Sequence, residues 1–246
     1  HPLSSDRIDA LREVVDESEY TDVKDTEEEQ YRLEMAKAKL RGFLEGPQVV
    51  FSKYPPTDQS QPARYARSVA HFKAADLKNA LKEIDSLILE NNKNPYFFEL
   101  KAQILYESGQ GQASLKPARK ALELKPNAPL LKLALAQSLL EESDDSSTFE
   151  AIKLLKSALN TERENSYAWY TLSRAYGEVG MKAEAKYATA EQAYAIGDLA
   201  RASSFAKRAQ TDLERGNPLW RRASDIIVVS DAQLAKKNSR NRGRKP

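Results

Sequence analysis

The stretch Pro95–Ala128 (PYFFELKAQILYESGQGQASLKPARKALELKPNA) decides the fold, because its spacing recurs along the chain. Counted from Pro95, this 34-residue stretch has small side chains at positions 8 and 27, glycine at 15 and proline at 32 (Ala102, Ala121, Gly109 and Pro126). Small residues let two helices approach closely, glycine permits a tight turn between them, and proline ends the second helix. The stretch therefore predicts a pair of antiparallel helices.

Further copies of this spacing begin at Gln61, Pro129 and Ser166. The copy at Ser166 matches best, with Trp169, Leu172, Tyr176, Gly180 and Ala185 at positions 4, 7, 11, 15 and 20. The copies at 61 and 129 depart at several positions, for example at Arg67 and Lys132. One hairpin cannot bury its own apolar face, so copies must stack. The pattern resembles the tetratricopeptide repeat, which implies an all-α fold, an α-solenoid of antiparallel helix hairpins.

Turn and capping signals divide the chain into five regions. We expect a linker helix within 1–20, an N-terminal helix and loop in 21–60, the repeat solenoid in 61–213, a capping helix in 214–232 and a basic disordered tail in 233–246. Thr26 and Glu29 form a capping-box pattern at the start of a helix. The Gly-Pro and Tyr-Pro-Pro sequences in 46–60 predict a loop or short irregular link.

Composition excludes several kinds of site. The 246 residues include no Cys and only two His, so thiolate zinc sites, iron–sulfur clusters and disulfides are impossible, as is a multi-histidine metal centre. No apolar run approaches the ~20 residues that span a bilayer, which predicts no transmembrane segment. The sequence begins with His1 rather than Met, from which we expect a piece of a longer protein.

Charge is distributed unevenly along the chain. Residues 16–34 hold nine acidic and two basic residues, whereas 236–246 hold six basic residues and no acidic one. The net charge of +2 thus leaves a weakly acidic body once the tail is set aside. Nucleic-acid binding needs clustered cations, so we expect no nucleic-acid partner. Phosphate or anionic-lipid binding by the tail alone is the alternative to a solvated, disordered end.

No catalytic motif is present, so the sequence predicts no catalytic residue. Ser5 and Asp6 lie near His1, but the two residues read as the start of a helix leading into Ile8 rather than as part of a triad. The lone His71 falls at an aromatic seam position, which indicates a packed helix residue rather than a metal ligand.

The chemistry that remains is a binding surface. In stacked hairpins, the first helix of each repeat lines the concave face. The residues that we predict to form a protein-binding groove there are Tyr65, Phe72, Tyr96, Gln103, Tyr106, Gln137, Tyr167, Tyr170 and Arg174. Tyrosine combines contact area with hydrogen bonding, which suits a peptide groove. The alternative is that several of these tyrosines only pack against neighbouring hairpins. The lysine and asparagine pattern that grips chaperone C-terminal carboxylates is missing, because Glu99, Gln103, Leu133 and Gln137 stand at the matching positions.

A second resemblance rests on the ends of the chain and three internal segments. His1–Ile8 (HPLSSDRI) looks like the H-P-x-x-x-x-R-I/L stretch that closes the catalytic domain of certain bacterial zinc metallopeptidases of the H-E-x-x-H type. Segments that fit the same family are AKAKLRGF from Ala36, PARYA from Pro62, NPYFFEL from Asn94 and GNPLWRRASDI from Gly216. These enzymes resemble the periplasmic β-barrel assembly-enhancing protease and carry tetratricopeptide repeats after the protease domain.

The resemblance implies that this chain is a non-catalytic region downstream of the protease, with 1–20 as the tail of the protease domain. It implies no cofactor in the chain, zinc in the parent enzyme and a periplasmic location. It also implies partners among outer-membrane protein substrates or their assembly machinery, besides the protease domain itself. His1 is then a candidate inhibitory zinc ligand in the full-length enzyme. The alternative is a free-standing scaffold or adaptor for envelope assembly or secretion.

Overall fold

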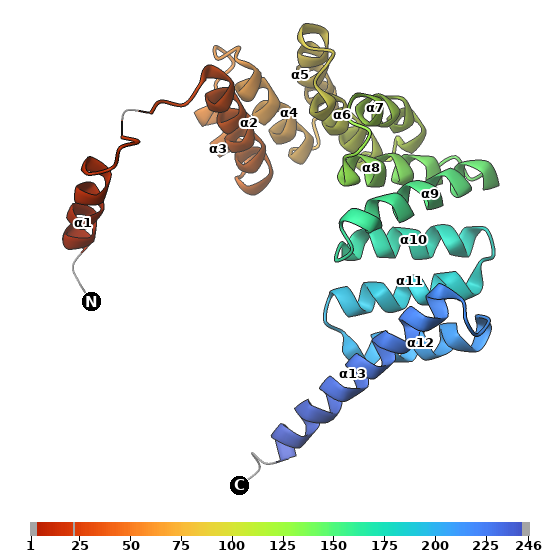
Figure 1. Ribbon diagram of the computed structural model, residues 1–246. Coiled ribbons are helices and arrows are strands. Elements are labelled where there is room, and N and C mark those ends of the chain that lie inside the picture. Colours follow the sequence, from red (N-terminus) through yellow and green to blue (C-terminus); the bar gives the residue numbers. More distant parts are fainter. Residues whose placement is uncertain (1–3, 22, 243–246) are drawn as a thin grey trace. The chain divides into compact units, whose positions relative to one another are not determined.

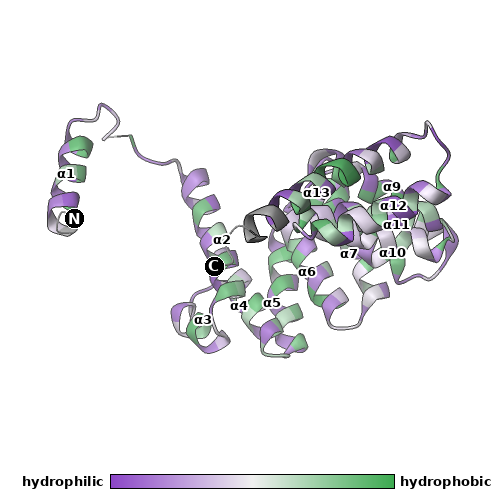
Figure 2. Cartoon of the chain, turned by 90° about the horizontal axis from the view of Figure 1, so that it is seen from below, coloured by the Kyte–Doolittle hydropathy of each residue, from purple (hydrophilic) through white to green (hydrophobic). Residues whose placement is uncertain are grey.

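The computed structural model describes residues 4–21 and 23–242, and these residues form thirteen helices and no strand. They divide into two compact units, His1–Ala74 and Ala75–Pro246. Each helix carries both apolar and hydrophilic residues, so one stripe can be buried (Figure 2). Within the described ranges, no helix is both long and apolar enough to cross a bilayer. The all-α prediction is confirmed.

The helices follow the predicted periods closely. The first unit contains α1 (Ser4–Asp16), α2 (Glu27–Leu44), α3 (Pro47–Lys53) and α4 (Gln61–Lys73). The second contains α5 (Leu77–Glu90), α6 (Pro95–Glu107), α7 (Gly111–Leu124), α8 (Pro129–Leu140), α9 (Asp145–Thr161), α10 (Ser166–Glu178), α11 (Lys182–Ala195), α12 (Leu199–Asp212) and α13 (Pro218–Arg242). Figure 1 shows them in chain order.

The first unit is built on the packing of α4 against α2 and α3. The crossing of α2 and α4 depends on Gly42, where an added Cβ would lie 2.9 Å from Cβ of Val69. The capping box at the start of α2 is present: the backbone N–H of Glu29 donates to the Thr26 hydroxyl, and the Glu29 carboxylate accepts from the Thr26 backbone N–H. The hydrogen bonds from Thr26 hold the pKa of Glu29 below its usual value.

The segment expected to be an irregular link contains a helix, which corrects the prediction for 46–60. Pro47 occupies the first turn of α3, where its missing N–H has no helical partner to lose, so Gly-Pro begins a helix here rather than ending one. Arg67, which departs from the repeat pattern, has a structural reason. It is 2% exposed and its guanidinium donates to the carbonyls of Pro55 and Asp58, 2.9 and 2.7 Å away.

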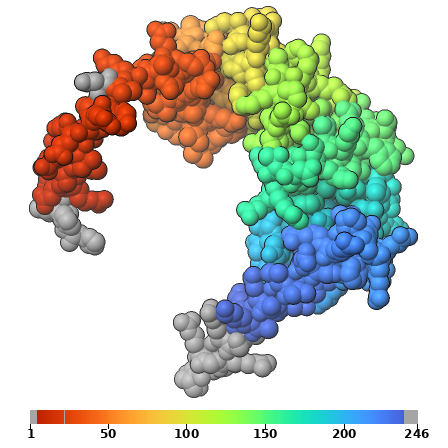
Figure 3. All heavy atoms as spheres, in the orientation of Figure 1, coloured from red at the N-terminus to blue at the C-terminus, as the bar shows by residue number. Residues whose placement is uncertain are grey.

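In the second unit, helices pair as the repeat predicts: α6 with α7, α8 with α9, and α10 with α11. The small residues of the pattern are buried at the helix contacts, among them Ala102, Ala121, Ala136, Ala151 and Ala158. Successive hairpins follow one another without a break in the space-filling view (Figure 3, yellow-green to blue). The core of this unit runs continuously from Ala102 to Ile226.

Position 15 of every repeat adopts a left-handed backbone conformation. Its φ is +76° at Gly109 and +72° at Gly180, where the sequence has glycine. The same conformation occurs at Ala75 (φ +59°) and Ser143 (φ +55°), where the sequence has no glycine. An L-residue in this region costs about 1–2 kcal/mol, so two of the four repeats store strain at the turn.

The C-terminal end differs from the prediction. The capping helix expected over 214–232 is the first part of α13, which continues to Arg242 through most of the segment predicted to be a disordered tail. Good helix formers follow Ser230 without a glycine or proline before Gly243, which explains the extension. Asp231 fixes α13 to α12, since its carboxylate accepts from Ser203 at 2.6 Å and Lys207 at 2.8 Å.

A buried carboxylate joins the last helices. Glu191 on α11 is 2% exposed and accepts two hydrogen bonds from Arg222 on α13, at 2.8 and 3.0 Å. The hydroxyl of Tyr187 donates to the same carboxylate at 2.7 Å. Burial and the neighbouring charge raise the pKa of Tyr187. Nothing in the sequence pattern singled out Glu191.

Changing the turn residue tests the strain at position 15. Ser143→Gly should raise the free energy of unfolding by about 0.5–1 kcal/mol, because relief of strain exceeds the entropy that glycine adds to the unfolded chain. Gly180→Ala is the matched control. It should lower the free energy of unfolding by about 1 kcal/mol through backbone strain alone, because φ is +72° and no atom lies within 4 Å of a Cβ built there. Urea denaturation measures both, and a destabilising Ser143→Gly would contradict the account.

Removing Arg222 tests the buried ion pair. Arg222→Met should lower the free energy of unfolding by about 3 kcal/mol, because it leaves the Glu191 carboxylate buried without its fork of donors. The double variant with Glu191→Leu should recover much of that loss. Equal stabilities of the single and double variants in urea denaturation would show that the pair is not coupled.

Candidate functional site: a cleft on α6, α8 and α10

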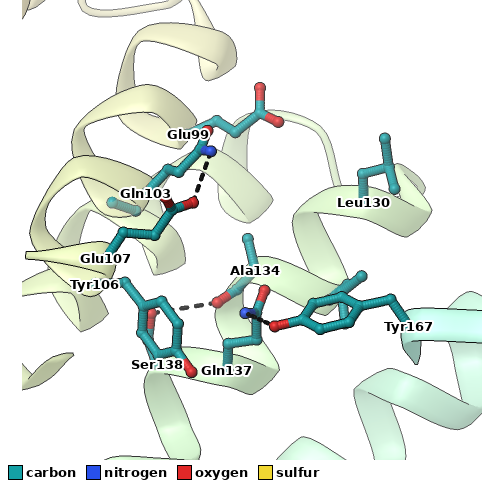
Figure 4. Close-up of a pocket in the computed structure, with 11 residues that line it drawn as sticks. Glu99, Gln103, Tyr106, Glu107, Leu130, Ala134, Gln137, Ser138 and Tyr167 are labelled. Atoms are coloured by element: carbon teal, nitrogen blue, oxygen red, sulfur yellow. Dashed lines mark hydrogen bonds between the residues drawn. The ribbon is translucent and has the colours of Figure 1, made fainter. Parts of the chain in front are cut away.

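The second unit has a cleft of about 380 Å³ on the side formed by the first helices of three repeats. Figure 4 shows its side chains converging from α6, α8 and α10. The lining residues are Glu99, Ala102, Gln103, Tyr106 and Glu107 from α6, Leu130, Leu133, Ala134, Gln137 and Ser138 from α8, and Tyr167 from α10. The mixture of aliphatic, aromatic, amide and carboxylate groups suits a peptide.

Helix α6 supplies the polar wall. Glu99, Gln103 and Glu107 are spaced by four residues, so they share one face of the helix. The amide of Gln103 donates to the Glu107 carboxylate at 2.8 Å. The helix begins at Pro95, and the side chain of its N-cap residue Asn94 accepts a hydrogen bond from the backbone N–H of Tyr96 at 3.0 Å.

Helix α8 supplies the floor and one side. Leu133, Ala134 and Ser138 lie along it, and the hydroxyls of Ser138 and Ser114 are 2.7 Å apart, which ties α8 to α7. The amide of Gln137 donates to the hydroxyl of Tyr167 at 3.0 Å, so α8 is also joined to α10 across the cleft (Figure 4). The cleft is therefore held by hydrogen bonds between neighbouring repeats.

Helix α10 supplies Tyr167, which is half exposed. Partial burial raises the pKa of this tyrosine, with smaller contributions from Tyr106 and Glu107 and an opposing one from Arg174. The ring of Tyr170 stacks beside that of Tyr167, with centroids 6.1 Å apart.

The structure places some of the predicted groove residues in the cleft and others outside it. Gln103, Tyr106, Gln137 and Tyr167 line one cleft. Tyr170 and Arg174 lie on α10 outside that lining, exposed beside it, and Arg174 is 3.7 Å from the Glu178 carboxylate.

Three predicted residues lie elsewhere. The Tyr96 hydroxyl accepts from Lys125 at 2.6 Å, and the tyrosine does not line the cleft. Tyr65 and Phe72 belong to α4 in the first unit, and Tyr65 is only 2% exposed, which corrects its assignment to a surface groove. Tyr65 packs inside the first unit, which is the alternative that the sequence left open for these tyrosines.

The sequence-based selection missed Glu107 and the apolar residues of α8. Glu107 occupies position 13 of its repeat, four residues after Gln103, and that spacing could have found it. Leu133 and Ala134 carry no such signal, because aliphatic residues line both cores and clefts.

Neither histidine contributes to a described site. His1, the predicted inhibitory zinc ligand, lies outside the described residues. His71 packs against Phe51, with ring centroids 4.7 Å apart. Within residues 4–21 and 23–242, no group of three or more His, Asp or Glu residues is placed to hold a metal ion.

Comparisons with known proteins identify the fold. No protein-family model matches the sequence, and no curated protein matches it either. Solved structures do resemble it: a MamA structure (MSR-1) has a TM-score of 0.54 at 14% identity, over 68% of this chain and 95% of that one. The fold is that of tetratricopeptide-repeat proteins.

Two further tetratricopeptide-repeat structures agree. MamA from Desulfovibrio magneticus RS-1 gives a TM-score of 0.52 at 14% identity, over 77% of this chain and 99% of that one. The C-terminal part of a repeat-containing protein from Cytophaga hutchinsonii gives 0.53 at 14% identity, over 82% and 80%. Identities this low establish the tetratricopeptide fold alone, so partners must be argued from the cleft.

Proposed function

We propose that this chain is a non-catalytic protein-binding region that holds extended segments of partner proteins in the cleft of its second unit. The observation that carries the proposal is the cleft itself, to which three successive repeats contribute tyrosine, glutamine and aliphatic side chains. Tyrosine is enriched where proteins bind one another, because it adds apolar contact and a hydrogen bond at low entropic cost.

A finer proposal places the chain in a larger protein. The resemblance of HPLSSDRI and the internal segments supports a zinc metallopeptidase of the H-E-x-x-H type as parent, periplasmic and active in outer-membrane protein quality control. In that setting the cleft recruits substrates or assembly partners for the protease domain. In this proposal zinc would be bound by the protease domain of the parent enzyme.

The alternative is a free-standing adaptor for envelope assembly or secretion, which would use the same cleft. Two of the matching segments contain Asn-Pro, and both pairs start helices: Asn94 caps α6, and the Asn217 side chain accepts from the backbone of Leu219 at 2.9 Å. Helix starts of this kind serve any repeat protein. The sequence upstream of His1 decides between the two proposals, since an H-E-x-x-H helix there supports the peptidase and its absence rejects it.

A peptide array tests the binding function. Tyr106→Ala and Tyr167→Ala should each weaken peptide binding by about tenfold, since truncating a central aromatic contact typically costs more than 1 kcal/mol. Tyr96→Ala is the matched control, an exposed tyrosine on the same helix as Tyr106 but outside the cleft. Binding that is reduced equally by Tyr96→Ala and Tyr106→Ala, or by neither, would move the site elsewhere.

A further inference from the structure

The charge of the cleft is of one sign. Its lining includes two carboxylates, Glu99 and Glu107, and no Lys, Arg or His among its eleven residues. Both carboxylates lie on α6, eight residues apart, which is about 12 Å along a helix. Glu107 is exposed and Glu99 is half-buried. A positively charged ligand group is therefore favoured along this wall and a carboxylate is disfavoured.

The Glu107 carboxylate in the cleft favours a hydrogen-bond donor as ligand. The amide of Gln103 already donates to Glu107, and the amide of Gln137 already donates to Tyr167. The Ser138 hydroxyl donates to the Ala134 carbonyl at 3.2 Å. These bonds use one N–H of each amide, whereas the Glu107 carboxylate can only accept and keeps lone pairs that a ligand N–H can reach.

The rest of the lining suits a long cationic side chain. Leu130, Leu133 and Ala134 form an apolar surface for an aliphatic stem. The rings of Tyr106 and Tyr167 can accept the face of a planar cation. A guanidinium combines five donors with such a face, and an ammonium does not.

Two cations near the cleft interact with groups outside its lining. Arg174, whose charge acts on Tyr167, is paired with Glu178 on its own helix. Lys125 donates to the hydroxyl of Tyr96 and lies 5.0 Å from the centre of that ring. Neither residue lines the cleft, whereas Glu107 lines it and is exposed to solvent.

We propose that the cleft selects partner segments by an arginine side chain, whose stem lies on α8 and whose guanidinium reaches Glu107 beside Tyr106 and Tyr167. This inference rests on the proposed peptide-binding function and adds the chemical class of the partner: extended segments that carry arginine next to apolar residues.

Citrulline substitution isolates the charge. Short synthetic peptides that bind the full chain on an array are made again with each arginine replaced by citrulline, which keeps the shape and removes the positive charge. Affinities are measured by fluorescence polarisation. Citrulline peptides should bind about tenfold more weakly, because a charge-assisted hydrogen bond to a carboxylate is lost.

Glu107→Gln is the complementary change on the protein. It should weaken arginine peptides about tenfold and leave citrulline peptides unchanged, so that the two substitutions are not additive. Glu123→Gln is the matched control, an exposed carboxylate on the second helix of the same repeat, and should change neither.

The outcomes separate this inference from the function on which it rests. If citrulline peptides bind as well as arginine peptides, or if Glu107→Gln behaves like Glu123→Gln, the arginine inference is wrong while the peptide-binding function stands. If no peptide on the array depends on Tyr106, the cleft is not the peptide-binding site, and the function proposed for it is wrong.

Discussion

The left-handed turn at position 15 is the constraint on which the second unit depends. It reverses the chain within a few residues, so that each second helix returns antiparallel to the first. The helices then meet at close range because alanine occupies the contacts, with Ala102, Ala136 and Ala151 all buried. The unit retains this geometry even where the sequence supplies Ser143 instead of glycine, since stacking of whole hairpins stabilises the strained turn.

The cleft is a consequence of the same geometry. Hairpins that reverse in the same way bring the first helices of successive repeats side by side, so α6, α8 and α10 present matching faces. Side chains four residues apart on α6 then line one wall, and a hydrogen bond from Gln137 to Tyr167 joins α8 to α10 across the cleft. A binding surface of this kind needs no loop, because rigid helices position every group in it. Its chemistry can change from one protein to another while the hairpins remain the same.

Much of the fold was predictable from the sequence, because the residues at the helix contacts recur at fixed spacing. Ala102, Gly109 and Ala121 mark a hairpin without any knowledge of the rest of the chain. The errors arose where local signals have two meanings. Gly46-Pro47 reads equally as a helix end and a helix start, and the basic composition of 233–246 masks a run of good helix formers.

The candidate site was harder to predict for a related reason. Tyrosines on the first helices serve both packing and binding, and only burial separates Tyr65 from Tyr167. The spacing of Glu107 is compatible with a position in the cleft, but the hydrogen bond that its carboxylate accepts from Gln103 cannot be read from spacing. The burial of Glu191 could not be predicted either. A charged residue in a helical pattern is expected to be exposed to solvent, and only the structure shows that Arg222 lies beside Glu191.

Hydrogen exchange of the full chain tests the central claim most directly, because it reports which helices a bound segment stabilises. The probe is a mixture of the arginine peptides selected on the array, added in excess. The account predicts slower exchange of backbone amides in α6, α8 and α10, with α7, α9 and α11 less affected. Protection confined to the second helices, or absent from all six despite measured binding, would contradict it.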